Sequence, residues 1–431
     1  MKKSVMWVVI ALMMATVIAS CTLDSDSGTE PVLVICPFDS DSILTNEDNE
    51  LRYISLTLTE QELVNNNNEF AFNLFREMMK SQAREQSEIV SPISITYALG
   101  MLNNGASGDT QKQINKVLGF GEAGADGIND FCKKMLTEAP SLDKLTKVMI
   151  ANTIYMNQGF ELKKDFISKA KTFYDAEPET RNFADGKTRD VINKWGNDHT
   201  QGMIPEVLKE EEFDPIAVSY LLNAIYFKGA WAKKFDKENT NDETFKGYST
   251  EKQVPMMHQE QEFNYAENEL CQALCLPYGN NAYRMTILLP KEGKTINEVL
   301  KTLTAETWQN YQWMGKAIVD LKLPRLESQS EIKLEKIMST LGMPNAFDPN
   351  LADFSNFCNV PTYIDMMKQV AKIKLNEEGT EAAAITVIGM KNEASASEPP
   401  HVSFYATRPF LYVISEQSTG AIFFIGKYVG D

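Results

Sequence analysis

Side chains that could carry acid–base or metal chemistry are scarce in this sequence. Its three histidines, His199, His258 and His401, belong to no HExxH pair and lie beside no pair of cysteines. The stretch Gly105-Ala106-Ser107-Gly108 is not the GxSxG turn of a hydrolase, and Gly293-Lys294-Thr295 lacks the earlier glycine of a phosphate-binding loop. We interpret both stretches as turns. The sequence therefore predicts no catalytic centre, no metal site and no cofactor.

One cysteine has a different chemical context, because it follows a targeting signal. Two lysines precede an apolar run from Val5 to Ile18, which is shorter than the roughly 20 residues that span a bilayer. Residues 1–20 are therefore predicted to be a cleaved signal peptide.

The tetrad Ile18-Ala19-Ser20-Cys21 resembles a bacterial lipobox, in which the cysteine becomes the acylated N-terminus. We expect an exported outer-membrane lipoprotein anchored in the membrane through Cys21, with exposure on the cell surface left open. An ordinary signal with a chance cysteine is the alternative.

The remaining cysteines do not predict a disulfide framework, because they are odd in number and scattered along the chain. They are Cys36, Cys132, Cys271, Cys275 and Cys358. Cys271 and Cys275 fall on one predicted strand, where four residues span about 13 Å, too far for a disulfide. We expect packed or free thiols.

The most informative stretch is residues 377–400, which we call the loop segment. It opens with Glu377-Glu378-Gly379-Thr380, carries no charge from Ala382 to Met390, and ends at Pro399-Pro400. It follows a predicted strand and turns at Gly379. The small, polar residues after Met390 are typical of an exposed loop that proteases can reach.

Alternate residues of the loop segment differ in character. One face of an extended strand would carry only small or apolar residues: Thr380, Ala382, Ala384, Thr386, Ile388 and Met390. The other face would carry Glu381, Ala383, Ile385, Val387, Gly389 and Lys391. The first face suits the buried side of a strand in a sheet. An alanine-rich linker or a frayed helix is the plain alternative.

Helical and strand patterns alternate along the rest of the chain. Buried-helix patterns begin at Asn68 and at Pro92, where proline suits the first turn. Further helices are predicted at about 109–118, 162–173, 186–199 and 295–312. Strands are predicted at Tyr220–Phe227, Met285–Leu289, Ala317–Leu323, Val370–Leu375, Phe410–Ile414 and Ala421–Tyr428. We expect an α+β fold dominated by sheets.

Composition limits the partners and the number of domains. The 431 residues are 43% hydrophobic and carry a formal net charge of −17. Such acidity opposes binding to nucleic acid or to anionic membrane surfaces, which are recognised through Lys and Arg. Residues 21–50 lack apolar periodicity and suit a flexible acidic tether. No linker-like stretch follows residue 65, so we expect a single domain over residues 51–431.

Ordered motifs over about residues 55–431 resemble the serpin family of protease inhibitors. The matching segments are Asn68–Phe72, Ser91–Ile95, Ala98–Leu102, Gly105–Thr110, Ile192–Trp195, Thr200–Gly202, Asn223–Trp231, Leu323–Arg325 and Arg408–Phe410. The resemblance implies the serpin fold, with three β-sheets, about nine helices and the loop segment as an exposed reactive-centre loop.

A mechanism is implied by the same resemblance. In serpins a target protease attacks the loop, forms an acyl-enzyme and is carried away as the cleaved loop inserts into a sheet. We therefore expect a monomeric suicide inhibitor whose partner is a serine-type endopeptidase, with cysteine-type enzymes also open. A non-inhibitory serpin, or a surface lipoprotein that binds host protein or glycan, is the alternative.

The resemblance also implies roles for single residues around the start of the loop segment. The hinge residues would be Glu377, Gly379, Thr380, Ala382, Ala383 and Ala384. Glu377 would pair with Arg325 beside Trp231, where the loop enters the sheet. A solvated charge at Glu377 and a core aromatic at Trp231 are the ordinary alternatives.

A second group would lie under the sheet and allow its strands to part. Ser91, Ser94 and Asn223 belong to it by resemblance, together with Gln369, where the family usually has a histidine. A glutamine amide can still donate and accept hydrogen bonds. An ordinary helix cap is the alternative for Ser91.

The cleaved bond stays open. The usual hinge length counted from Gly379 leads to Glu393-Ala394, which implies a protease that accepts acidic residues. The segment as far as Pro409 is slightly longer than in many serpins. Met390, Lys391, Asn392 and Ser395 therefore stay alternatives, and they suit elastase-like or trypsin-like enzymes.

Overall fold

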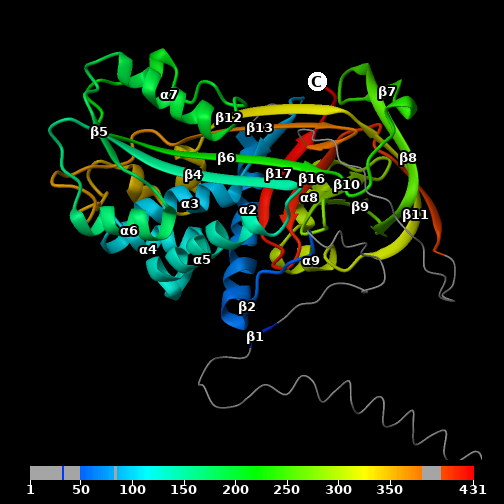
Figure 1. The fold of residues 1–431 in the computed structure, drawn as a ribbon, viewed down its shortest axis with the longest axis horizontal. Helices are drawn as coiled ribbons and strands as arrows, with labels where there is room; N and C mark the ends of the chain where they lie inside the picture. Colours follow the sequence, from blue (N-terminus) through cyan, green and yellow to red (C-terminus); the bar gives the residue numbers. More distant parts are fainter. Residues whose placement is uncertain (1–31, 34–48, 82–84, 381–398) are drawn as a thin grey trace, which may run out of the picture.

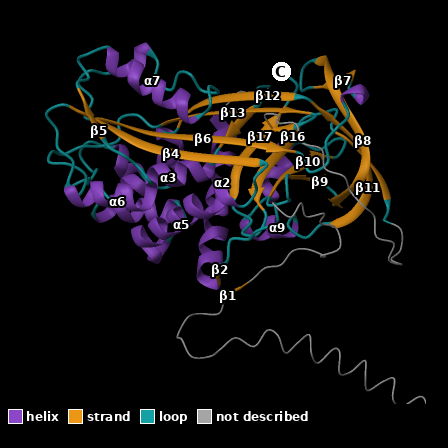
Figure 2. Ribbon diagram, in the orientation of Figure 1, coloured by secondary structure: helices purple, strands orange, loops and turns teal. Residues whose placement is uncertain are grey.

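Most helices gather on one side of a long sheet, while α7 lies on its other side (Figures 1 and 2). The computed structural model describes residues 32–33, 49–81, 85–380 and 399–431. These residues form three sheets and nine α-helices, in agreement with the expected α+β class. The helices are α2 (Leu58–Ser81), α3 (Pro92–Asn103), α4 (Gly108–Val117), α5 (Gly124–Glu138), α6 (Lys164–Tyr174), α7 (Lys187–His199), α8 (Ile296–Thr302), α9 (Ala305–Asn310) and α10 (Glu335–Leu341).

A six-stranded sheet runs along the long axis of the molecule (Figure 1). Its strands, in spatial order, are β12 (Leu326–Lys333), β13 (Lys368–Asn376), β14 (Gly379–Thr380), β6 (Ser219–Ala230), β4 (Thr146–Asn157) and β5 (Glu179–Arg181). Buried and exposed residues alternate strictly along β12, because only one face of this strand is covered. Helices α3 to α6 lie on one side of the sheet (Figure 1).

A nine-stranded sheet fills the other end of the molecule. Its strands, in spatial order, are β15 (His401–Tyr405), β11 (Gly315–Pro324), β8 (Glu251–Glu267), β9 (Cys271–Tyr278), β10 (Tyr283–Pro290), β16 (Phe410–Glu416), β17 (Ile422–Tyr428) and β3 (Glu88–Val90), with β7 (Asn241–Lys246) paired to β8. β10 is buried throughout, since both its faces are covered. A third, small sheet pairs β1 (Val32–Leu33) with β2 (Leu56–Thr57).

All six predicted strands are present, whereas two helical predictions need correction. The first helix begins at Leu58 and not at Asn68. A reciprocal pair of hydrogen bonds between Thr57 and Glu60 closes its first turn. Asn67 and Asn68 are buried inside it, and they bond to Leu118 and Gly420 respectively. Their polar character therefore hid the helical pattern.

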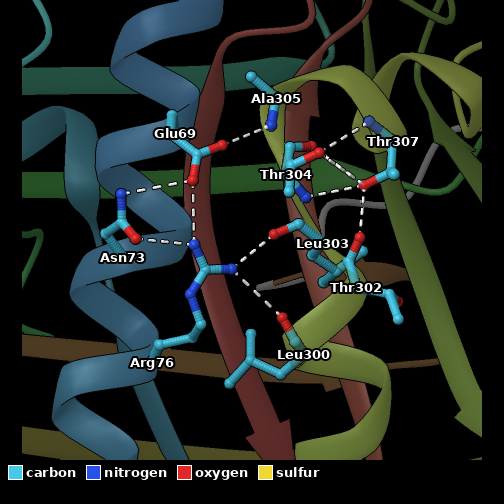
Figure 3. Close-up of polar contacts among 9 residues, drawn as sticks. All are labelled: Glu69, Asn73, Arg76, Leu300, Thr302, Leu303, Thr304, Ala305 and Thr307. Atoms are coloured by element: carbon cyan, nitrogen blue, oxygen red, sulfur yellow. Dashed lines mark hydrogen bonds and ion pairs between the residues drawn. The ribbon is translucent and has the colours of Figure 1, made fainter.

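The helix predicted at 295–312 is two helices, α8 and α9, with a break at Leu303 and Thr304. Figure 3 shows how α2 stabilises that break. Arg76 donates to the carbonyl oxygens of Leu300 and Leu303 at the end of α8. The Glu69 carboxylate accepts a hydrogen bond from the backbone N–H of Ala305 at the start of α9. A negative charge at this position stabilises the N-terminus of a helix.

Candidate functional site

The first four residues of the loop segment, 377–380, form its root. The last two of them lie inside the six-stranded sheet as the short strand β14. Gly379 pairs with Asn376 of β13 on one side and with Ala230 of β6 on the other, both antiparallel. Thr380 follows the same registers and is 2% exposed. Its hydroxyl lies 2.7 Å from the hydroxyl of Tyr278, on β9 of the other large sheet. The two residues after Glu378 are thus already part of a buried strand.

Glycine is the only residue type that fits at position 379. Its φ angle is +144°, in the region that side chains avoid. A Cβ at this position would lie 2.0 Å from the carbonyl oxygen of Gly229 and 2.8 Å from the Cα of Ala230. Insertion of β14 beside β6 therefore depends on a glycine here.

Glu377 is a buried carboxylate, so a solvated charge is not its environment. It is 1% exposed and accepts hydrogen bonds from Arg325 Nε at 2.8 Å and from the Thr240 hydroxyl at 2.6 Å. Burial by itself raises the pKa of this carboxyl. The bonds from Arg325 and Thr240 outweigh burial and hold the pKa of Glu377 below its ordinary value. The group is therefore a bound anion.

Trp231 covers the same root from the end of β6. Its indole N–H donates to the carbonyl oxygen of Asn376 at 3.0 Å, and its backbone N–H donates to the carbonyl of Glu378 at 2.8 Å. Its ring stacks on Tyr278 with centroids 4.5 Å apart. Trp231 is therefore a core aromatic that also binds the backbone on both sides of Glu377.

The glutamine beneath the sheet binds the start of helix α3. Gln369 of β13 accepts the backbone N–H of Ser91 at 2.8 Å and donates to the Ser91 carbonyl at 3.0 Å. The Ser91 hydroxyl caps α3 by accepting the N–H of Ser94, and it donates to the carbonyl of Phe423. Ser91 is thus both a helix cap and the partner of Gln369.

Asn223 lies on β6 and does not share the hydrogen-bond partners of Gln369. Its side chain donates to Asn152 Oδ1 of β4 at 2.8 Å. Gln369 and Asn223 nevertheless line one cavity together with Ser94. Ser91 thus contacts both Ser94 and Gln369, whereas Asn223 bonds to Asn152 and shares only the cavity lining with Ser94 and Gln369.

That cavity measures about 340 Å³ and lies at the end of the sheet where β6 and β13 begin. Helix α3 forms part of its wall, and the connection leading into β13, which includes Phe357 and Ile364, forms another part. Above it, residues 224–228 of β6 and 370–374 of β13 have no backbone pairing with each other among the described residues. Of the strands in the described part of the chain, only β14 lies between β13 and β6.

Several residues of this site were not singled out from the sequence. They are Tyr278, Thr240, Asn152 and the lysines Lys234 and Lys237, which form ion pairs with Glu378. Each comes from a strand or turn far from the loop segment in the sequence. The one sequence signal for Tyr278 was its place at the end of the apolar strand Cys271–Tyr278.

Other predicted positions lie outside the described residues. These are Cys21 and the loop positions Ala382, Ala383, Ala384, Met390, Lys391, Asn392, Glu393, Ala394 and Ser395. In the part of the chain that the structure describes, no cluster of His, Cys, Asp or Glu side chains has metal-binding geometry, and no helix has the length and hydrophobicity to cross a bilayer. Burial raises the pKa of the described thiols, Cys132, Cys271, Cys275 and Cys358.

Comparisons with known proteins agree on one family. Residues 65–430 match the family model described as Serpin (serine protease inhibitor). The chain is 33% identical to Serpin B6 of Macaca fascicularis over 371 residues, and 34% identical to human Serpin B8 over 372 residues. Each alignment covers 84% of this chain and 97% of the relative.

Solved structures give the same result. Tengpin, a thermophilic serpin in its native state, is 27% identical with a TM-score of 0.78, over 91% of this chain and 100% of that one. Native protease nexin-1 with heparin is 28% identical with a TM-score of 0.75, over 86% and 100%. Human thyroxine-binding globulin with its hormone is 27% identical with a TM-score of 0.77, over 86% and 99%.

Proposed function

The chain belongs to the serpin family, and from that membership we propose that it inhibits a serine-type or cysteine-type endopeptidase by loop insertion. The target protease cleaves the loop segment, and the residues before the cut extend β14 between β13 and β6. The protease, still linked as an acyl-enzyme, travels with the inserted strand and is held inactive. In this role the protein is the bait and not an enzyme.

The position of β14 is the observation that carries the proposal. Its two residues already pair with both neighbouring strands, and those strands have no pairing with each other beyond it in the described sheet. Each further loop residue that enters adds backbone hydrogen bonds at about 1 kcal/mol each. Ten such residues supply on the order of 10 kcal/mol, which matches the roughly 5–15 kcal/mol that keeps a protease folded.

A binding role without inhibition is the competing proposal. Thyroxine-binding globulin with its hormone is among the similar solved structures, so the fold also serves as a carrier. The inward hinge residues favour inhibition here, since Thr380, Ala382 and Ala384 are small and uncharged. A bulky or charged side chain on that face would oppose entry into the sheet.

The proposal is tested with a soluble chain that starts at Leu51 and a panel of serine and cysteine proteases. We expect an adduct that survives denaturing electrophoresis with a serine protease, while the mass of the released C-terminal peptide identifies the cleaved bond between Met390 and Ser395. Thr380→Arg should abolish the adduct, because this side chain points into the buried face. Glu381→Arg, at the neighbouring position that strand alternation predicts to face outward, is the matched control and should retain it. Cleavage by every protease without an adduct or loss of protease activity would refute inhibition.

We also propose that the protein is exported and held in the outer membrane as a monomer through an acylated Cys21. The lipobox-like tetrad that ends at Cys21 supports this proposal. Growth with radiolabelled palmitate should label the full-length protein, and Cys21→Ala should remove the label and release the protein from membranes. Labelling that persists in Cys21→Ala would overturn the assignment of the anchor.

A further inference from the structure

The cavity at the starts of β6 and β13 has the size and the lining of a small-molecule site. Its volume is about 340 Å³, and sites for small ligands in proteins measure about 300–1,000 Å³. Its inner wall is apolar and consists of buried side chains, namely Leu99, Leu102, Leu334 and Phe357. Walls of this kind bind the apolar body of a ligand, while a few polar groups fix its orientation.

The cavity opens to solvent between two chain segments. Residues 212–218 lead into β6, and residues 362–367 lead into β13. Ile216 in the first segment is 81% exposed, and Tyr363 in the second is 39% exposed. Both side chains line the cavity, so its apolar surface continues from the interior to the solvent.

Each of these two segments places one carboxylate at the opening. Asp214 and Asp365 both line the cavity, and both are exposed. Burial raises the pKa of the Tyr220 hydroxyl, and the charges of Asp214 and Asp365 add to the rise, so both carboxylates lie near that hydroxyl. Their hydrogen bonds come from neutral groups, the backbone N–H of Ile216 at 2.9 Å and the hydroxyl of Tyr363 at 3.4 Å.

The one basic side chain among the described lining residues is engaged elsewhere. Lys368 is 6% exposed and pairs with Glu212 at 2.6 Å and with Glu331 at 3.1 Å. Within the described ranges, no Lys, Arg or His side chain forms an ion pair with Asp214 or Asp365. The rim of the cavity therefore carries two negative charges that this part of the chain does not neutralise.

We propose that this cavity binds a small amphipathic cation, a molecule with one apolar body and one ammonium group. The apolar body lies against Leu99, Leu102 and Phe357, and the ammonium group lies at the rim beside Asp214 and Asp365. An ammonium group donates hydrogen bonds to carboxylates and supplies the charge that complements this rim. The inference goes beyond the proposed inhibition, because it concerns the intact chain and uses no residue of the loop segment.

Three probes that share one ring system test this assignment on the intact chain. They are 1-naphthylmethylamine, 1-naphthylmethanol and 1-naphthoate, which are cationic, neutral and anionic at neutral pH. Isothermal titration calorimetry at low salt should show the amine binding at least about tenfold more tightly than the alcohol, and no binding of the carboxylate. At high salt the affinity of the amine should fall toward that of the alcohol, because salt screens exposed charges. Equal affinities of the amine and the alcohol at low salt, or no binding of either, would overturn the proposal.

Substitutions show whether the probe lies in this cavity. Asp214→Asn combined with Asp365→Asn should weaken the amine about tenfold and leave the alcohol unchanged. Asp242→Asn, at an exposed position on β7, is the matched control and should change neither affinity. Ala98→Phe, which fills the cavity from α3, should abolish binding of both probes, with its fold checked by circular dichroism. The two asparagine substitutions lie at exposed positions and decide the question even if Ala98→Phe does not fold. Unchanged amine binding in the double variant, or in folded Ala98→Phe, would contradict the proposal.

Discussion

Arg325 holds the carboxylate of Glu377 with its Nη2 atom 2.6 Å from Oε1, and this contact joins the root of the loop segment to the meeting point of the two large sheets. Arg325 stands between β11 of the nine-stranded sheet and β12 of the six-stranded sheet. Glu377 directly follows β13. Glu377, at the start of the loop segment, is therefore fixed to the framework of both large sheets.

Removal of the Glu377 charge should destabilise the intact protein. Glu377→Gln leaves the Arg325 guanidinium without its anion, although the side chain of Arg325 is 44% exposed and solvent compensates for part of the loss. We expect the free energy of unfolding in urea to fall by about 1–2 kcal/mol. Glu327→Gln is the matched control, because the Glu327 side chain is 51% exposed in its ion pair with Lys372, and it should change stability by less than about 0.5 kcal/mol. Equal effects of the two substitutions would contradict the anchoring role.

The stabilisation by Glu377 should also depend on pH. Its pKa is lower in the folded protein than in the unfolded chain, so the unfolded chain binds more protons in acid. The contribution is complete above the ordinary carboxyl pKa of about 4.3 and is lost as pH falls through the folded value. The stability difference between wild type and Glu377→Gln should be constant from pH 7 to pH 5 and shrink below pH 4. Unfolding curves at each pH check this. A stability difference that widens in acid would contradict the lowered pKa of Glu377 in the folded protein.

Gly379→Ala should drive β14 out of the sheet. The new Cβ would meet the Gly229 carbonyl oxygen at 2.0 Å, so the strand cannot keep its position beside β6. We expect a loss of more than about 2 kcal/mol of stability and faster proteolysis near Thr380. Gly293→Ala is the control, since Gly293 has a φ of +75° with no neighbouring atom within 4 Å, and it should cost only about 1 kcal/mol. A Gly379→Ala protein as stable as Gly293→Ala would mean that β14 is not held as described.

The contact between Thr380 and Tyr278 should appear as an energetic coupling. Tyr278→Phe and Thr380→Val each remove one hydroxyl of a pair that is 2.7 Å apart and fully buried. Each change leaves the other hydroxyl without its partner, so the two losses should not add. A double-mutant cycle by urea unfolding should give a coupling energy of about 1 kcal/mol. Additive losses would show that this contact does not hold the inserted root.

The sequence predicted the elements with strong periodicity and missed those with polar interiors. Strand β13 and helix α3 were predicted because apolar residues and Pro92 mark them clearly. The start of α2 was misplaced, because Asn67 and Asn68 are buried through hydrogen bonds that only the folded chain makes. Helix α5 also went unpredicted, although its buried residues Ile128, Cys132 and Met135 have the one-sided spacing of a surface helix.

The candidate site was accessible to sequence reasoning only in part. The loop segment and its alternating faces were predicted from local pattern, and the structure describes only residues 377–380 and 399–400 of it. Tyr278 and Asn152 belong to the site through strand order and register, which local sequence does not encode. The cavity under Gln369 is also a product of packing between α3, β6 and the connection into β13.

Backbone hydrogen exchange before and after loop cleavage tests loop insertion most directly. Beyond β14, the amides of residues 368–374 of β13 and 219–228 of β6 that face each other across the sheet have no strand partner among the residues that the structure describes. After a verified cut in the loop segment, their exchange should slow by at least about tenfold, while amides between β4 and β6 stay unchanged. Unchanged exchange at the β13 and β6 positions after complete cleavage would contradict insertion of the loop into this sheet.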